Sequence, residues 1–229
     1  MKPLYLLIIL FLSIIAQPLL AQKKPVAILT IEGGPSIIKL RGNEYMEAYY
    51  KSTLGFAAGL GLQIVQPKSI FSFKTNIFYE KNGAISDEIL LYDETGQIAG
   101  TVSNSITYNY ITIPGLLRIT TRSQNKFFIN FGPYVGFLLK EVDQIKGIGL
   151  SQKTDATNLN NKMDGGISFG AGFQIPVKEK WLLSAELRDN IGFYDINNSP
   201  RSKGGSVQTN STNFLAGVAY RIQKTRRYY

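Results

Sequence analysis

Residues 127–139 read FFINFGPYVGFLL, an almost wholly apolar stretch that is interrupted by Asn130, Pro133 and two glycines. The stretch is shorter than the ~20 residues that a transmembrane helix needs, and proline and glycine disfavour a helix of any kind. With the two-residue period of a β-strand, however, its side chains separate onto two faces. One face carries Phe127, Ile129, Phe131, Val135, Phe137 and Leu139, and the other carries Asn130, Gly132, Tyr134 and Gly136. The stretch therefore predicts a long strand with a large apolar face and a small or polar face.

The same alternation recurs along the chain and predicts eight strands. They are expected at residues 26–36, 53–64, 70–80, 105–119, 127–139, 167–175, 181–190 and 214–222. The connections at 66–69, 121–125 and 176–179 are short, whereas the others are long. Short periplasmic turns and long extracellular loops are typical of outer-membrane barrels. We therefore predict an all-β fold, an eight-stranded antiparallel up-and-down transmembrane β-barrel located in the cell outer membrane.

The two faces also indicate which side of the barrel meets lipid. The apolar faces carry large residues, while the opposite faces carry mostly Gly, Ala and Ser. The narrow interior of an eight-stranded barrel can hold small residues and a few long polar ones, but not a Phe or Leu from every position. This pattern favours an apolar outside in lipid over the alternative, a soluble lipocalin-like binding barrel.

Charged residues on the small faces are expected to form a polar cluster in the lumen. The predicted members are Glu32, Lys74, Glu80, Arg118, Glu186, Arg188 and Arg221. Unpaired charges are costly in a dry interior, so these groups should form ion pairs or meet water. The cluster could be a charge-selective pathway, but in so narrow a barrel a packed structural plug is the preferred interpretation.

The N-terminus has the layout of a secretory signal peptide. One Lys precedes an apolar run from Leu4 to Ala16, and Leu19-Leu20-Ala21 precedes Gln22. Residues 1–21 are therefore expected to be cleaved and residues 22–229 to form the barrel domain. The chain has no Cys and no His, which removes disulfides, thiol nucleophiles and the commonest general base and metal ligand. We expect no catalytic residues, no metal and no cofactor, and an enzyme is not expected.

The predicted strand ends and turns fit a protein held between two membrane surfaces. Aromatic girdles are expected from Phe127, Trp181 and Tyr220 on the periplasmic side and from Tyr79 and Phe193 on the outer side. The periplasmic side is also strongly basic, which suits anionic phospholipid headgroups as partners. Its basic residues are Lys23, Lys24, Lys68, Arg122, Lys126, Lys178, Lys180, Lys224, Arg226 and Arg227. The high isoelectric point is thus explained without nucleic acid, for which no binding motif is present.

Residues 88–93 and 97–102 predict a hairpin that extends above the membrane, with its turn at Asp93-Glu94-Thr95-Gly96. Residues 140–162 and 197–213 are polar and predict loops, the second of them flexible.

Several short motifs, in this order, resemble the outer-membrane β-barrel family that is common in Bacteroidota-type Gram-negative bacteria and often labelled porin-family or PorT-like. They are Leu20-Ala21-Gln22, Tyr79-Glu80-Lys81-Asn82-Gly83-Ala84, Tyr110-Ile111-Thr112-Ile113-Pro114, Gly132-Pro133-Tyr134-Val135-Gly136, Asp164-Gly165-Gly166, Gly170-Ala171-Gly172, Ala185-Glu186-Leu187-Arg188 and Gly217-Val218-Ala219-Tyr220-Arg221-Ile222. The chain departs from the family where Thr112 and Asn76 replace a frequent Glu.

The resemblance implies an assembly signal in the last strand, formed by Gly217, Tyr220 and Ile222, and hence recognition by the barrel assembly machinery. Leu215 stands where a polar residue is usual, and the chain continues past Ile222 to end in KTRRYY. Association with secretion or envelope proteins is implied for PorT-like members only.

Two function classes follow for such a barrel. The first is a structural or interaction protein with a lumen filled by side chains, accessory to secretion or envelope assembly. The alternative is a small passive pore of porin-like transport. The narrow lumen of eight strands favours the first.

Overall fold

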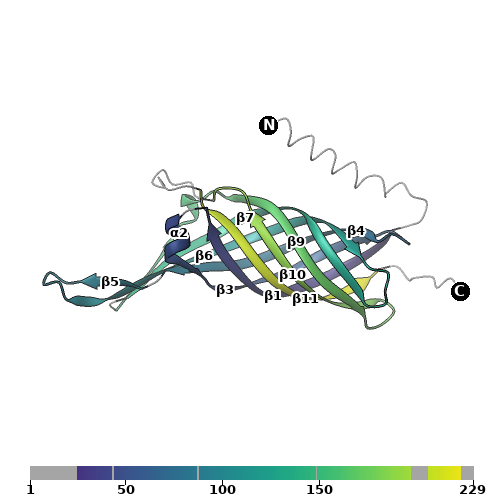
Figure 1. Ribbon diagram of the computed structural model, residues 1–229, viewed down its shortest axis with the longest axis horizontal. Coiled ribbons are helices and arrows are strands. Elements are labelled where there is room, and N and C mark those ends of the chain that lie inside the picture. The colour runs from purple at the N-terminus through teal and green to yellow at the C-terminus, as the bar shows by residue number, and fades with distance from the viewer. Residues whose placement is uncertain (1–24, 43, 87, 148, 197–205, 223–229) are drawn as a thin grey trace, which may run out of the picture.

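The computed structural model describes residues 25–42, 44–86, 88–147, 149–196 and 206–222. The expected signal peptide at residues 1–21 and the C-terminal KTRRYY lie outside these residues. Eight long antiparallel strands in the described chain form a closed ring (Figure 1). They are β1 (Val26–Arg41), β3 (Leu54–Val65), β4 (Phe71–Ser86), β6 (Ile98–Thr120), β7 (Lys126–Gly147), β9 (Met163–Pro176), β10 (Trp181–Gly192) and β11 (Gln208–Arg221). The predicted eight-stranded up-and-down barrel is confirmed.

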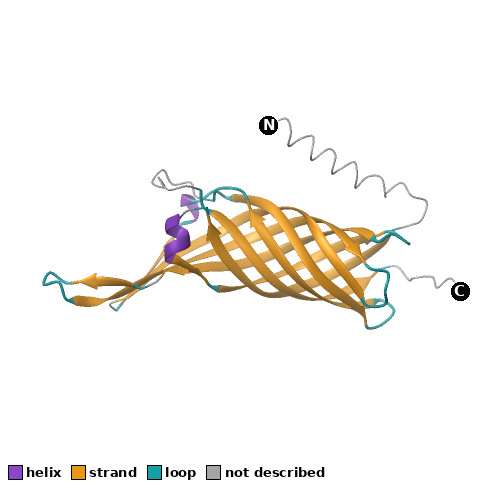
Figure 2. Cartoon of the chain, in the orientation of Figure 1, coloured by secondary structure: helices purple, strands orange, loops and turns teal. Residues whose placement is uncertain are grey.

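Neighbouring strands of the ring are also neighbours in the sequence, except where the ring closes. There the first and last strands pair, with Ile28 opposite Arg221 and Glu32 opposite Gly217. Short turns join β3 to β4, β6 to β7 and β9 to β10 at one end, and long connections leave the other end (Figure 2). We refer to these as the short-turn end and the long-loop end.

The remaining elements of the described chain belong to the long-loop end. They are the helix α2 (Glu44–Tyr49), the 3-10 helix η2 (Thr157–Leu159) and the short strands β2 (Tyr50–Ser52), β5 (Ile89–Tyr92) and β8 (Leu150–Asp155). Among the described residues, no helix is long and apolar enough to cross a membrane.

The side chains alternate between a buried inner face and an exposed outer face, as the period of two predicts. In β7, Phe127, Ile129 and Phe137 are exposed, while Asn130 and Tyr134 are buried. The large apolar side chains therefore face outward and many polar ones face inward. This is the inverse of a soluble barrel and argues against the lipocalin-like alternative.

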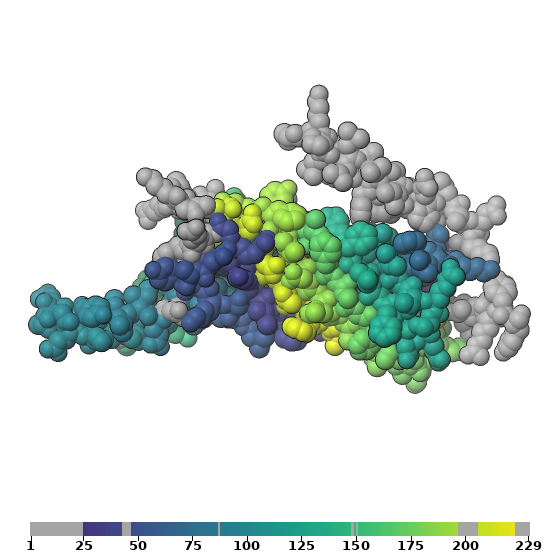
Figure 3. All heavy atoms as spheres, in the orientation of Figure 1, coloured from purple at the N-terminus to yellow at the C-terminus, as the bar shows by residue number. Residues whose placement is uncertain are grey.

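Several strands run well beyond their predicted ends. On β1 and β4 the pairing continues to Arg41 and Ser86, and β6 and β7 pair as far as Val102 opposite Gly147. The predicted hairpin is confirmed, because Ile89–Tyr92 pairs with residues 98–102 of β6. This arm projects from the barrel at the left of the space-filling view (Figure 3).

The two other loop predictions need correction. The segment 140–162 is not simply a loop, because β7 continues to Gly147 and pairs with β8. Residues 208–213, expected to be flexible, belong to β11, while 197–205 lie outside the described residues. Residues 140–147 and 208–213 are mostly polar and lack a single apolar face, so backbone pairing with a neighbouring strand orders them without an alternation in the sequence.

Candidate functional site: the lumen of the barrel

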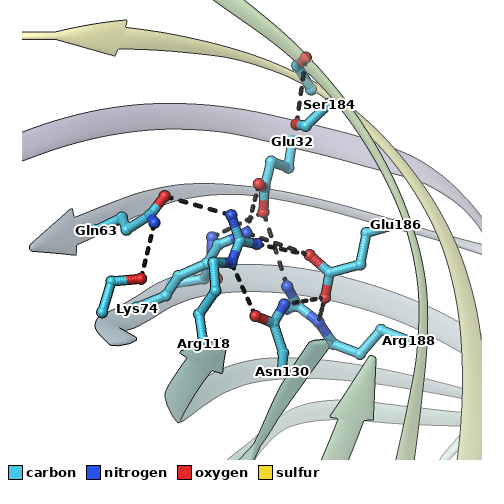
Figure 4. Close-up of polar contacts among 11 residues, drawn as sticks. Glu32, Gln63, Lys74, Arg118, Asn130, Ser184, Glu186 and Arg188 are labelled. Carbon is cyan, nitrogen blue, oxygen red and sulfur yellow. Dashed lines mark hydrogen bonds and ion pairs between the residues drawn. The ribbon is translucent and has the colours of Figure 1, made fainter. Parts of the chain in front are cut away.

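The centre of the lumen is an ion-pair network built around Glu186 on β10. Its Oε2 lies 3.3 Å from Nζ of Lys74 and 3.3 Å from Nη2 of Arg118. Its Oε1 accepts a hydrogen bond of 2.6 Å from Nε of Arg188. One carboxylate from β10 thus contacts cationic groups from β4, β6 and β10 (Figure 4).

Glu32 on β1 provides the second carboxylate of the network. Nζ of Lys74 lies 2.5 Å from its Oε1, and Nη2 of Arg188 lies 3.9 Å from its Oε2. Lys74 therefore bridges the two glutamates across the lumen. The five charged groups are all buried, so their attraction acts with little screening by water.

Neutral side chains add hydrogen bonds to the network, although Nη2 of Arg188 and Oδ1 of Asn76 have no hydrogen-bond partner among the described residues. Asn130 accepts a bond of 2.8 Å from Nε of Arg118 and donates one of 2.8 Å to Oε1 of Glu186. Gln63 accepts from Nη1 of Arg118 at 3.3 Å, and Asn76 donates to Oε2 of Glu32 at 3.0 Å. Buried ion pairs are tolerated when such bonds satisfy the remaining donors and acceptors.

Two inward phenylalanines, which the sequence analysis did not identify, pack against the arginines. The guanidinium of Arg118 lies 3.6 Å from the centre of the Phe128 ring, and that of Arg188 lies 5.1 Å from the centre of the Phe78 ring. Aromatic faces attract cations, most strongly where water is excluded. The sequence did indicate their direction, since each phenylalanine lies an even number of residues from the inward polar residues of its strand and so shares their face.

Glycines on the inner face leave room for this network. A Cβ at Gly170 would lie 2.6 Å from Oε1 of Glu186, and one at Gly217 would lie 2.6 Å from Cγ of Glu32. At Gly61 it would lie 2.1 Å from Nδ2 of Asn76. The small residues at these inner positions therefore leave space for the long polar and charged side chains opposite them.

The structure places the seven predicted lumen residues unequally. Glu32, Lys74, Arg118, Glu186 and Arg188 form the network, which we call the ion-pair layer. Glu80 is buried nearer the long-loop end, where it accepts a hydrogen bond of 3.4 Å from Asn82.

The prediction that Arg221 belongs to the cluster is wrong. Arg221 is half-buried at the short-turn end and donates a hydrogen bond of 3.3 Å to the carbonyl of Glu179. Arg221 is at an inward-facing position of β11. It comes two residues after Ala219, which is part of an apolar cluster at the short-turn end, so it lies at a different level of the barrel from the ion-pair layer. Parity identifies the face of a strand, and it does not identify the depth along the barrel.

Apolar clusters lie on both sides of the polar interior. At the short-turn end Ile28, Leu182 and Ala219 pack together, with Val26 and Val65 against them. Towards the long-loop end a larger cluster contains Leu40, Ala84, Ile106, Tyr108, Tyr110, Leu138, Ile196 and Val207. These inward apolar residues were not predicted, because the inner faces were expected to carry mostly small or polar side chains.

Tyr220 of the expected assembly signal contributes to an aromatic pair at the short-turn end. Its ring centre lies 4.9 Å from that of Trp181, and Nζ of Lys180 lies 5.7 Å from the Tyr220 ring centre. Phe127, Trp181 and Phe193 are exposed, as a girdle position requires. The role of Gly217, Tyr220 and Ile222 in assembly remains a prediction.

Turn carboxylates are held by local hydrogen bonds at the long-loop end. Asp93 accepts bonds from the hydroxyl of Thr95 at 2.6 Å and the amide of Gln97 at 2.9 Å, and these lower its pKa. The hydroxyl of Thr157 likewise lowers the pKa of Asp155, whose Oδ2 also lies 3.8 Å from Nζ of Lys140. Hydrogen bonds to the ionised form have this effect.

Comparison with known proteins agrees with this architecture. A family model described as an outer membrane protein β-barrel domain matches residues 20–198, which is more than half of the chain. The chain belongs to this family. It is an integral outer-membrane β-barrel protein, and in such barrels the short turns are periplasmic and the long loops extracellular.

Solved structures of outer-membrane barrels are similar to the chain in fold. Neisserial surface protein A is 11% identical, with a TM-score of 0.44 over 85% of this chain and 96% of that chain. A major outer membrane protein from Thermus thermophilus is 10% identical, with a TM-score of 0.46 over 87% of this chain and 100% of that chain. OprG from Pseudomonas aeruginosa is 10% identical, with a TM-score of 0.40 over 88% of this chain and 99% of that chain. No curated protein matches the chain. At such low identities and TM-scores, no functional role follows from these similarities.

Proposed function

We propose that the protein is a structural or interaction barrel of the outer membrane that does not conduct solutes through its lumen. The observation that carries this proposal is the burial of the ion-pair layer. The exposed fractions of Lys74, Arg118 and Arg188 are 0%, 1% and 1%. Such complete burial supports a lumen without a continuous water path at this level, and apolar clusters lie beyond these side chains on both sides.

The surface that would meet a partner is the extracellular arm formed by β5 and the start of β6. All four residues of β5 (Ile89, Leu90, Leu91 and Tyr92) are exposed, and Ile98 is exposed opposite Tyr92. Residues 88–102 contain acidic residues and neither Lys nor Arg. An exposed apolar strand with acidic neighbours suits a protein partner that is apolar and basic.

The resemblance to PorT-like proteins of Gram-negative Bacteroidota supports an accessory role in secretion or envelope assembly. The partners proposed are envelope or secretion proteins, the barrel assembly machinery and outer-membrane lipids. We propose no enzymatic activity, because the chain lacks both His and Cys, on which small catalytic sites commonly depend. The alternative, a small passive pore, draws support from the charged side chains that face the lumen.

Single-channel conductance in a planar bilayer tests the proposal. We expect the purified protein to be silent while a heat-dependent shift in gel mobility and protease protection show that it is folded and inserted. Reproducible conductance steps would overturn the proposal in favour of the pore. The double variant Arg118→Ser/Arg188→Ser serves as the open control, because it removes the two largest side chains of the ion-pair layer and should produce steps.

A further inference from the structure

A small polar chamber lies in the lumen between the ion-pair layer and the apolar cluster of the long-loop end. Its volume is about 20 Å³, enough for one water molecule or one small ion. Its lining includes two carboxylates and several neutral oxygen donors. Glu80, Asp164, Tyr110, Asn190 and Thr209 are among the residues that line it.

Among the described residues, no basic side chain lies within ion-pair distance of the two carboxylates of the chamber. Asp164 is 6% exposed and accepts hydrogen bonds from Thr209 at 2.5 Å and from the amide of Gly165 at 2.7 Å. Glu80 is 4% exposed, and neither carboxylate forms an ion pair with a Lys or Arg in the described part of the chain. Buried charges in proteins are normally paired or bound to a metal ion.

Two neutral oxygen groups of the chamber also lack partners in the described part of the chain. The hydroxyl of Tyr110 and Oδ1 of Asn190 have no hydrogen-bond partner there, although both residues are only 4% exposed. Asn190 is anchored through its Nδ2, which donates to Ser211 at 3.3 Å. Leaving a buried polar atom unpaired has a cost of about 1–3 kcal/mol, so such atoms in one cavity indicate a bound species.

The charges and the atom types define the chemistry of that species. The ion-pair layer has three cationic and two anionic side chains, whereas the chamber has two carboxylates, so the chamber is the electronegative half of the lumen. Its polar groups are carboxylate, amide and hydroxyl groups, and the chain has no His or Cys. Oxygen ligands select hard cations such as Ca²⁺, which accepts carboxylate and amide oxygens together.

We propose that this chamber is a binding site for one hard cation of the size of Ca²⁺. Asp164 and Glu80 supply the charged ligands, and the unpartnered oxygens of Asn190 and Tyr110 complete the site. In the described residues no three acidic side chains come together, so the remaining ligands are neutral. The proposal is independent of whether the barrel conducts solutes.

The test uses the full chain in detergent micelles after treatment with EDTA. Tb³⁺ serves as the probe, because tyrosines beside a bound Tb³⁺ sensitise its luminescence and Ca²⁺ competes for the same ligands. We expect one saturable Tb³⁺ site per chain that Ca²⁺ displaces, with at least tenfold weaker binding in Asp164→Asn and in Glu80→Gln. The matched control is Asp189→Asn, whose carboxylate is on the opposite face of β10 and binds Thr212 at 2.7 Å. Its Tb³⁺ affinity should be unchanged.

Three results would overturn the proposal. The first is no saturable Tb³⁺ binding in the unmodified protein, and the second is a Tb³⁺ affinity in Asp164→Asn and Glu80→Gln equal to that of the unmodified protein. The third is a loss of affinity in Asp189→Asn as large as in those two variants. The first would mean that protons neutralise the carboxylates of the chamber and that water fills it, and the others would place the ion on exposed carboxylates. Asn190→Ala provides a second variant in case the carboxylate variants do not fold. It keeps both charges and should still weaken binding severalfold, with folding checked by gel mobility.

Discussion

The ion-pair layer and the extracellular arm use polar and apolar residues in opposite ways. In the layer, charged side chains are buried from water and contact partners on other strands. In the arm, consecutive apolar side chains of β5 are exposed, and within the described chain the strand pairs with β6 alone. In the barrel the apolar side chains face lipid, so the polar side chains are left on the inside, where they pair with one another. The arm has no second layer of structure against which its apolar side chains could be buried.

Because of this difference, we expect the ion-pair layer to determine the stability of the protein and the arm to provide its recognition surface. A change in the layer leaves a buried charge without its partner, which has a large cost. A change in the arm alters side chains that make few contacts, which usually changes stability very little. Four predictions test this separation.

The largest effect is expected for Glu186→Ala. The substitution leaves Lys74, Arg118 and Arg188 without their shared carboxylate, so the free energy of unfolding should fall by about 3–5 kcal/mol. Denaturant titration of the protein in lipid vesicles measures this change. Glu179→Ala in an exposed turn is the control and should be nearly neutral. A loss below about 1 kcal/mol for Glu186→Ala would mean that water replaces the ion pairs.

A smaller effect is expected for the phenylalanines beneath the arginines. Phe128→Leu should lower the free energy of unfolding by about 2 kcal/mol, because Arg118 lies only 3.6 Å from its ring centre. Phe78→Leu, beside the more distant Arg188 at 5.1 Å, should cost about 1 kcal/mol. The same titration compares the two variants. Equal losses would show that packing volume, and not the cation–aromatic contact, sets the effect.

The arm should tolerate substitution. The double variant Leu90→Ser/Tyr92→Ser removes two exposed apolar side chains and should change the free energy of unfolding of the barrel by no more than about 0.5 kcal/mol. Unfolding followed by Trp181 fluorescence reports on the barrel itself. A decrease in the free energy of unfolding of more than about 1 kcal/mol would show that the arm contributes to the stability of the barrel, as the ion-pair layer does.

The smallest effect concerns the turn of the arm and its dependence on pH. Hydrogen bonds from Thr95 and Gln97 lower the pKa of Asp93. The ionised carboxylate therefore stabilises the turn, and this stabilisation is fully present when the pH is above the ordinary pKa of Asp. The stabilisation is lost as pH falls through the lowered pKa. In NMR spectra of the protein in micelles, the amide of Gln97 should titrate with a midpoint below ~3.9, the usual value for Asp. Asp93→Asn should abolish this titration, and a midpoint at or above the usual value would contradict the prediction.

The barrel was predictable because lipid outside and side chains inside impose one strict alternation on every strand. Where that constraint ends, prediction failed, as in the extension of β7 to Gly147 and its pairing with β8. Five residues of the ion-pair layer were identified from parity and charge. The depth of Arg221, the stacking of Phe128 and the apolar clusters depend on which residues of different strands lie at one level. That depends on the stagger between strands, which a single sequence does not display.

The pairing of β1 with β11 has a consequence for how the chain reaches its final state. Ile28 and Arg221 are partners across the closing seam, although almost the whole described chain separates them. Until the eighth strand of the ring is in place, each partly formed sheet has two free edges, and contacts so distant in sequence form slowly. Closure therefore needs both β1 and β11, and a chain that ends before β11 would be an open sheet, however well its other strands pair.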